Sequence, residues 1–244
     1  MNSYQCPKSK FRIPKIWLVR FLDKTYRNIF QGFTPVNACV TDTMNRIFRF
    51  ANKLSILNTG DYYEFGVYKG YSLWHAQQVS LQCGNPHMRY FGFDCFSGLP
   101  KPTGIDDSGD FYEGEFFCTK EVVADNIKTH GGDLSKINLI KGYFDKTLTK
   151  GTQKKYKMKK IAIAFIDCDY YSSAKVVLEF IKDLLMVNTL IVFDDWNAFR
   201  QPGKKGEQLA FLEFTQKYPR IKLRKEFSYC WHGQVFRVTH CHEN

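Results

Sequence analysis

The sequence predicts a doubly wound α/β fold with a mostly parallel sheet, and three observations support this prediction. Short apolar runs bounded by turn residues alternate with segments whose apolar residues have helical spacing. The central runs are apolar almost throughout, as expected for strands that helices cover on both faces. Glycines and acidic residues follow several of these runs, at the sheet edge where α/β folds bind ligands.

The first 36 residues form a basic amphipathic segment. Between Ile16 and Phe30, apolar residues alternate with basic ones at roughly helical spacing, which predicts a helix. We expect this helix to pack on protein, either its own domain or a second subunit in a homo-oligomer, and contact with a membrane surface stays open. Residues 37–244 contain no linker or repeat and are predicted to form one domain.

The predicted elements of this domain follow one another in a regular order. A helix is expected over Thr41 to Leu57, with Met44, Ile47 and Phe48 on its apolar face. Five strands separated by helices are then predicted, at 61–67, 89–94, 137–142, 161–167 and 189–195. Two further runs, 221–227 and 233–239, are so close in sequence that they predict an antiparallel hairpin at one sheet edge.

Charge and cysteine usage indicate a compartment and limit the partners. The N-terminus has no secretory signal and no apolar run spans a bilayer, so a cytoplasmic location is expected. The eight cysteines include no CxxC pair, which favours reduced thiols. The cysteines and histidines near the C-terminus lack the spacing of a common zinc site. A net charge of +11 is compatible with binding to nucleic acid. The basic runs that carry much of this charge more often form a solvated face.

The first three strands end in residues suited to an adenosine-bearing ligand. Glu64 precedes a turn with Gly66 and Gly70, where a carboxylate could pair with a cationic cofactor and the backbone could approach it closely. Asp94 ends the second strand, the position from which an acidic residue binds ribose hydroxyls. After the third strand, Gly142 and Phe144 could border a flat base, although aromatic residues beside strands more often belong to the core.

Four aspartates follow the fourth and fifth strands: Asp167 and Asp169 in FIDCDYY, and Asp194 and Asp195 in FDDW. Carboxylates that converge at one sheet edge repel one another unless a cation binds or one of them is protonated. Oxygen ligands of this kind favour Mg²⁺ or Mn²⁺ over zinc. One of these acids could simply cap a helix, but capping poorly explains all four.

Read in order, the segments GDYYEFGVYKGYS, FGFDCFSGLP, INLIKGYFDKTL, FIDCDYYSSAKVVLEF and IVFDDWN resemble the macrocin (TylF-type) O-methyltransferase family. The resemblance implies the class I methyltransferase fold, which is Rossmann-like, with a helical lid at about 37–58. It also implies S-adenosylmethionine as cofactor, Mg²⁺ (or Mn²⁺), and a sugar, glycan or glycosylated small molecule as acceptor.

The resemblance also assigns roles to residues of this chain. Glu64, Gly66 and Gly70 would surround the amino acid part of the cofactor, Asp94 and Ser97 would hold the ribose side, and Gly142 with Phe144 would lie near the adenine. The metal would be bound by Asp167, Asp194 and Asp195. Asp169 would be the general base that removes a proton from the acceptor hydroxyl, or it could only orient a metal-bound water.

Three other functions are weighed against this interpretation. A cation-dependent methyltransferase of catechol-like molecules would use similar carboxylates. A base-modifying enzyme would carry an Asn/Asp-Pro-Pro-aromatic turn after the fourth strand, where this chain has Asp167-Cys168-Asp169-Tyr170, so nucleic acid is disfavoured. A scaffold that retained the fold would bind partners without methyl transfer, and the intact acidic positions speak against it.

Overall fold

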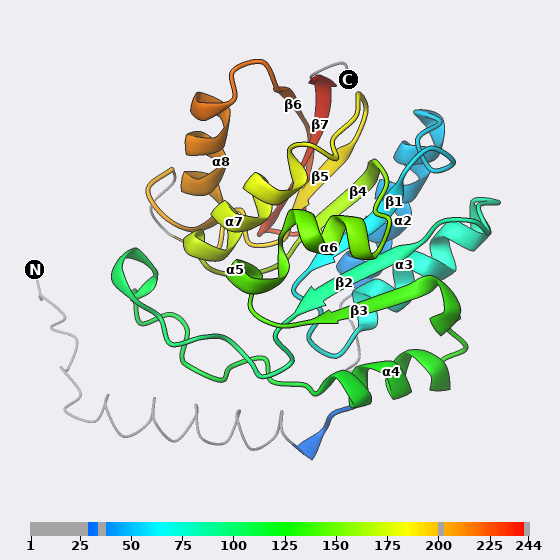
Figure 1. Ribbon diagram of the computed structural model, residues 1–244, viewed down its shortest axis with the longest axis horizontal. Coiled ribbons are helices and arrows are strands. Elements are labelled where there is room, and N and C mark those ends of the chain that lie inside the picture. Colours follow the sequence, from blue (N-terminus) through cyan, green and yellow to red (C-terminus); the bar gives the residue numbers. More distant parts are fainter. Residues whose placement is uncertain (1–28, 34–37, 200–202, 242–244) are drawn as a thin grey trace, which may run out of the picture.

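Seven strands form one mixed sheet in the computed structural model, which describes residues 29–33, 38–199 and 203–241 (Figure 1). The strand order is β3-β2-β1-β4-β5-β7-β6. The first five strands pair in parallel, and β7 pairs antiparallel with β5 and with β6. The strands are β1 (Asp61–Phe65), β2 (Tyr90–Asp94), β3 (Ile137–Lys141), β4 (Ile161–Ile166), β5 (Leu190–Phe193), β6 (Lys222–Tyr229) and β7 (Gly233–His240).

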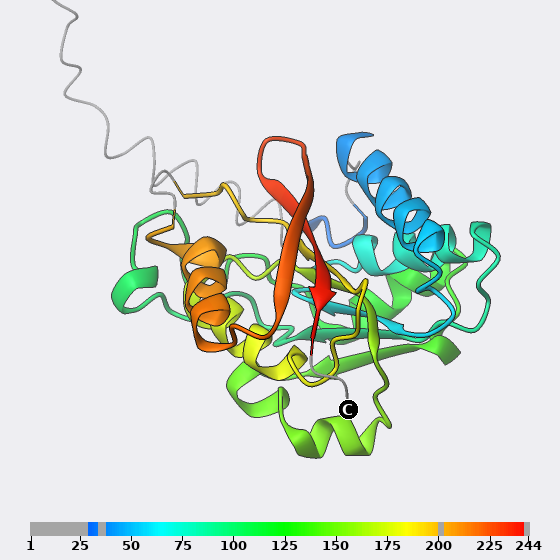
Figure 2. The same cartoon turned by 90° about the horizontal axis from the view of Figure 1, so that it is seen from above.

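Helices cover both faces of the sheet, and Figure 2 shows α2 and α6 on opposite sides of it. One side carries α2 (Ala38–Lys53), α3 (Tyr71–Gln82) and α4 (Lys120–Thr129), which contribute to one hydrophobic cluster. Residues of α7 and α8 belong to a second cluster on the other side, and Phe144 of α5 packs against it. The remaining helices are α5 (Phe144–Thr147), α6 (Lys150–Lys155), α7 (Tyr171–Ile181) and α8 (Gly206–Lys217).

The apolar strands are buried on both faces, as their composition predicts. Every residue of β1, β4 and β5 is buried. Successive residues of β1 alternate between the two hydrophobic clusters, with Tyr62 on the side of α3 and Tyr63 on the side of α7. Because side chains alternate along a strand, each central strand contributes to both halves of the core.

The structure confirms the predicted fold class, including the C-terminal antiparallel hairpin at one edge. Each predicted strand is present, with ends that differ by up to two residues. The helix predicted at Thr41 to Leu57 begins earlier, at Ala38, and ends at Lys53. The helix predicted near the N-terminus lies almost wholly outside the described residues, so its packing and membrane contact stay predictions.

One expectation about the cysteines is wrong, because Cys39 in α2 and Cys230 after β6 form a disulfide. The two residues are 191 positions apart in the sequence, so no local spacing marks them as a pair. Tertiary packing brings them together, since α2 lies against β6. Cys83, Cys95, Cys118 and Cys168 are free thiols. The cytoplasmic location stays a prediction.

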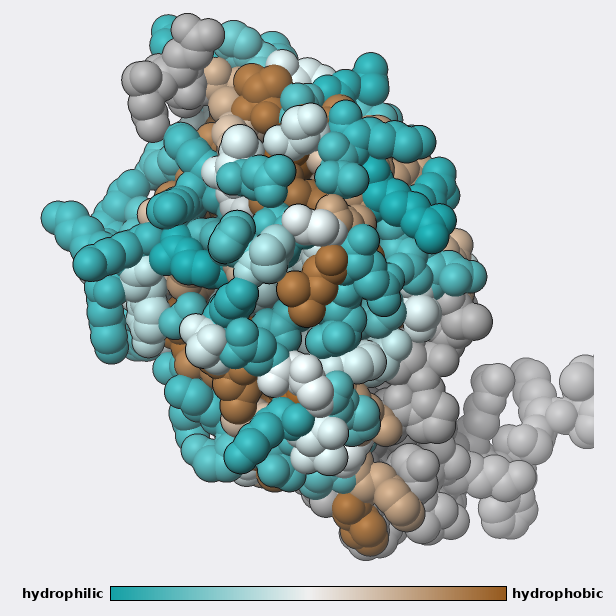
Figure 3. Space-filling model, turned by 90° about the vertical axis from the view of Figure 1, so that its right-hand side faces the viewer, coloured by the Kyte–Doolittle hydropathy of each residue, from teal (hydrophilic) through white to brown (hydrophobic). Residues whose placement is uncertain are grey.

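The surface of the described residues is mostly polar. Figure 3 shows a largely hydrophilic face with separate hydrophobic spots rather than one broad patch. Exposed large apolar side chains are scattered in the same way, as at Leu81, Val187 and Leu212. None of the helices in the described ranges combines the length and the apolar character that a membrane span requires.

Candidate active site

A cavity of about 330 Å³ lies beyond the carboxyl ends of β1, β2, β4 and β5. Its size falls within the range of small-molecule binding sites. It lies where a doubly wound sheet binds ligands. Eight residues singled out from the sequence line it, namely Gly66, Asp94, Gly142, Phe144, Asp167, Asp169, Asp194 and Asp195.

Asp94 joins two loops at one end of this cavity. Its Oδ2 atom accepts hydrogen bonds from the backbone nitrogens of Val67 (2.8 Å) and Tyr68 (3.1 Å). Its Oδ1 atom accepts one from the backbone nitrogen of Phe96, at 2.6 Å. A carboxylate has about four lone-pair sites, so Asp94 can order the turn after β1 and still accept a hydrogen bond from a ligand hydroxyl.

Gly66 is a glycine because the backbone of β4 passes directly beside it. Its φ is +93°, a left-handed conformation that favours glycine. A Cβ atom at this position would stand 1.6 Å from the carbonyl oxygen of Asp167. The turn after β1 is therefore packed against the chain that leaves β4 at Asp167, the first metal-ligand candidate.

Three of the predicted cofactor residues do not line the cavity. Gly70 lies at the start of α3, and a Cβ there would meet Val123 Cγ1 at 2.8 Å, so it provides close helix packing. Ser97 lies in an exposed turn. Glu64 is fully buried at the end of β1. The cofactor contacts assigned to these residues stay predictions.

Glu64 is held below the cavity by two hydroxyl donors. Tyr62 donates to its Oε2 at 2.6 Å, and Ser72 donates to its Oε1 at 2.8 Å. Burial raises the pKa of Glu64 to about 8, although the two hydrogen bonds oppose this shift. An acid of this kind is stabilised in its ionised form by any cation that binds nearby.

The three carboxylates of Asp167, Asp194 and Asp195 each bring an oxygen atom to within 4.8 Å of the others. Burial raises the pKa of Asp167 well above its usual range, and repulsion from Asp194 adds to the shift. Burial and then the charge of Asp194 raise the pKa of Asp195 to about 7. A divalent cation would remove this repulsion, and oxygen ligands suit Mg²⁺ or Mn²⁺.

Glu207 adds a fourth carboxyl group to the electrostatics of the cluster. The residue lies in the first turn of α8 with no exposed surface, and neither of its carboxyl oxygens has a hydrogen-bond partner. Burial raises the pKa of Glu207 well above its usual range, and the four aspartates add to the shift, Asp195 first. Buried carboxyls without partners are costly, so the donor set fits a bound cation.

Asp169 lies beside the cluster in a strained conformation. Its φ is +57°, which is uncommon for a residue other than glycine. Its backbone nitrogen donates to Asp195 Oδ2 at 3.1 Å, and the residue lines the cavity with only 8% of its surface exposed. Strained backbone persists where the surrounding structure enforces it, as it often does at functional sites.

Sequence analysis missed two residues that contact the cluster. Tyr229, the last residue of β6, and His232, in the turn before β7, hydrogen-bond to Asp194. The sequence relates His232 only to a possible zinc motif. Tyr229 belongs to no motif, and it lies far from Asp194 along the chain. The aromatic residues Tyr68 and Phe116 also line the cavity, with ring centroids 5.6 Å apart.

The chain matches the family model described as macrocin O-methyltransferase (TylF) over residues 42–209. A search of curated protein sequences finds no match. The chain is also similar to the solved structure of CalS11, a calicheamicin methyltransferase, with 19% identity, coverage of 97% of this chain and 99% of that chain, and a TM-score of 0.64. A second, apo structure of CalS11 is described as a TDP-rhamnose 3'-O-methyltransferase, with 22% identity, coverage of 94% and 88%, and a TM-score of 0.56.

The O-methyltransferase NovP is similar over 80% of each chain, with 16% identity and a TM-score of 0.63. At these identities the structural likeness establishes the fold, in agreement with the strand order described above.

Proposed function

The chain belongs to the macrocin O-methyltransferase (TylF) family, and we propose that it transfers a methyl group from S-adenosylmethionine to a hydroxyl group of a sugar with the help of a divalent metal ion. The acceptor would be a free sugar, a glycan or a glycosylated small molecule. CalS11, described as acting on TDP-rhamnose, shares the fold and supports this acceptor class. The chemistry of the cavity supports the metal.

The observation that carries this proposal is the convergence of Asp167, Asp194 and Asp195 in the same cavity as Asp94 and Gly142. One end of the cavity offers the acid and glycine positions that bind adenosine in α/β sheets. The other end offers oxygen ligands for a hard cation. A methyl donor and an activated hydroxyl could therefore meet within one cavity.

The four aspartates that follow β4 and β5 have distinct roles in the proposed reaction. When bound, S-adenosylmethionine supplies an electrophilic methyl group, and Mg²⁺ or Mn²⁺ lowers the pKa of a hydroxyl group. Asp167, Asp194 and Asp195 would hold the cation. Asp169 would accept the proton of the acceptor hydroxyl, and the transfer would convert S-adenosylmethionine into S-adenosylhomocysteine. Much of the remaining rate enhancement would come from positioning the two substrates.

A radiolabelled methyl-transfer assay tests the proposal. The purified protein would be incubated with labelled S-adenosylmethionine, a panel of free and nucleotide-linked sugars, and a panel of catechols, with and without a chelator. We expect transfer to a sugar that stops with chelator and returns with added Mg²⁺ or Mn²⁺. Asp169→Asn should lower the rate by a factor of about 10² to 10⁴. Asp145→Asn, at an exposed position of α5, is the matched control.

Three results would contradict parts of the proposal. Turnover that survives the chelator would rule out the metal. Turnover on catechols but on no sugar would replace the acceptor class and leave the chemistry in place. Tight binding of S-adenosylhomocysteine without transfer to any acceptor would favour a scaffold that retained the fold.

A further inference from the structure

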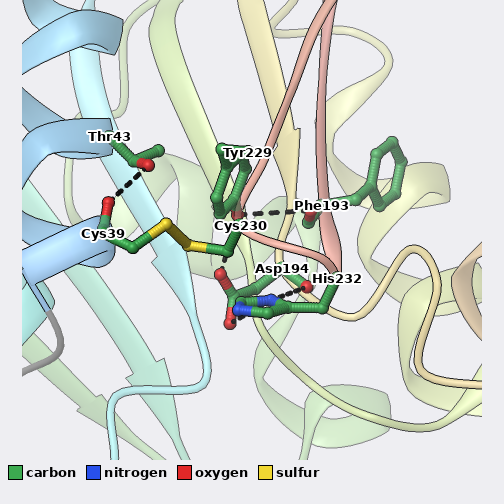
Figure 4. Close-up of a disulfide and its surroundings, with 7 residues drawn as sticks. All are labelled: Cys39, Thr43, Phe193, Asp194, Tyr229, Cys230 and His232. Carbon is green, nitrogen blue, oxygen red and sulfur yellow. Dashed lines mark hydrogen bonds and ion pairs between the residues drawn. A yellow bond between two sulfur atoms is a disulfide. The ribbon is translucent and has the colours of Figure 1, made fainter.

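The turn between β6 and β7 supports the metal-ligand candidate Asp194 from outside the cavity (Figure 4). The Tyr229 hydroxyl donates to Asp194 Oδ1 at 2.7 Å, and the same hydroxyl lies 3.3 Å from the carbonyl oxygen of Phe193. His232 Nδ1 lies 2.7 Å from the carbonyl oxygen of Asp194 and 3.7 Å from its Oδ2 atom. Both the side chain and the backbone of Asp194 are therefore held by one turn.

These contacts are shielded from water. Tyr229 is only 6% exposed, and the side chains of His232 and Asp194 are 19% and 20% exposed. A hydroxyl that donates to a carboxylate makes one of the stronger hydrogen bonds in proteins. Tyr229 therefore restricts the rotation of the Asp194 carboxylate before any cation binds.

The disulfide ties this turn to α2, the helix that packs beside β6. Cys230 follows Tyr229 directly and pairs with Cys39 in the first turn of α2, with 6.0 Å between the two Cα atoms. The α2 helix is anchored in turn, because Met44, Ile47 and Phe48 lie in the core. Cys230 also has a φ of +46°, so the bridge constrains a turn that the backbone alone does not favour.

We propose that Tyr229 is a positioning residue for the metal site and that the Cys39–Cys230 disulfide fixes the turn that carries it. The bridge then raises metal affinity although neither cysteine touches the metal. The inference rests on the proposed function, since it assumes that Asp194 binds a cation. Partners that orient a ligand typically change metal affinity by about 10- to 100-fold when removed.

The test measures Mn²⁺ binding by calorimetry on the full chain, beside binding of S-adenosylhomocysteine. Tyr229→Phe should lower the affinity for Mn²⁺ about tenfold and leave the affinity for S-adenosylhomocysteine unchanged. The electron paramagnetic resonance spectrum of bound Mn²⁺ should change as well. Tyr218→Phe is a matched control, because the Tyr218 hydroxyl also donates to a carboxylate, that of Glu179, outside the cavity.

The role of the disulfide is tested by the same measurement of Mn²⁺ affinity. A non-reducing peptide map should recover Cys39 linked to Cys230. The affinity for Mn²⁺ should fall several-fold in the double variant Cys39→Ser/Cys230→Ser and in the wild type treated with a reductant. Cys83→Ser, which removes a free thiol elsewhere, should not. Agreement between the reduced wild type and the variant excludes misfolding of the variant as the cause.

The possible failures are distinguishable. Equal Mn²⁺ affinity of Tyr229→Phe and the wild type would overturn the positioning role alone. Parallel loss of Mn²⁺ and S-adenosylhomocysteine binding would also overturn it, because general damage would explain both. A reduced wild type with full Mn²⁺ affinity would overturn the role of the disulfide. A wild type that binds S-adenosylhomocysteine but no Mn²⁺ would overturn the proposed metal, and this inference with it.

Discussion

Gly66→Ala should destabilise the protein more than any ordinary surface substitution. The new Cβ would stand 1.6 Å from the carbonyl oxygen of Asp167, and neither strand can move aside freely. The nitrogen of Gly66 donates to Phe93 and the nitrogen of Asp167 donates to Phe65, both at 2.9 Å. The left-handed φ costs about 1–2 kcal/mol. Breaking two ladder hydrogen bonds costs about 0.5–1.5 kcal/mol each.

The total is about 2–5 kcal/mol, a large part of the stability of a typical domain. Gly84→Ala is the matched control, because Gly84 also has a positive φ, +78°, but its Cβ would meet nothing within 4 Å. Urea unfolding of both variants separates the steric cost from the conformational cost. Gly84→Ala should lose about 1–2 kcal/mol and bind S-adenosylhomocysteine normally. The reasoning is refuted if the two variants lose the same free energy of unfolding.

Three further predictions follow from the charges. The affinity for Mn²⁺ should fall about tenfold per pH unit below pH 7. Burial and the charge of Asp194 raise the pKa of Asp195 to about 7, so the ion must displace the proton of Asp195 at lower pH. Calorimetry at pH 6 and pH 8 checks this, and equal affinities would contradict it. Asp167→Asn should raise the melting temperature of the metal-free protein at pH 8 by a few degrees. Burial and neighbouring acids raise the folded-state pKa of Asp167, so its ionisation lowers stability as pH rises. In scanning calorimetry the rise in melting temperature of this variant should therefore shrink towards pH 4. An equal rise at pH 4 and pH 8 would argue against this cause. Arg89→Met should lower the free energy of unfolding by about 3–5 kcal/mol, because the Asp61 side chain that Arg89 pairs with is 7% exposed; a loss below about 1 kcal/mol in urea unfolding would show that water replaces the guanidinium.

The strands could be predicted because the local pattern and the tertiary environment agree. IAIAFI of β4 is apolar at every position and buried at every position, so periodicity and burial carry the same information. The hairpin could be predicted because its strands are close in sequence. The ends of α2 were less predictable, since helix termini depend on capping and packing and not on the apolar stripe alone.

The site could be predicted in part for the same reason. Aspartates that end parallel strands meet at one sheet edge, so Asp167, Asp194 and Asp195 could be grouped from their order alone. Tyr229 could not, because its contact with Asp194 depends on how the hairpin packs against β5. The disulfide also joins residues that are distant in sequence. The unpaired carboxyl of Glu207 could not be predicted either, because only the structure shows that it is buried.

The position of β7 has a consequence for how the domain assembles. Within the described residues, β7 follows β6 in the chain but lies between β5 and β6 in the sheet, and no direct pairing joins β6 to the parallel strands. During synthesis, β6 therefore has no place in the sheet until β7 has emerged and docked on β5. The parallel strands can pair earlier, but the hairpin that holds Asp194 joins them only after β7 has emerged. A chain truncated before β7 should therefore leave a folded sheet with an unsupported site.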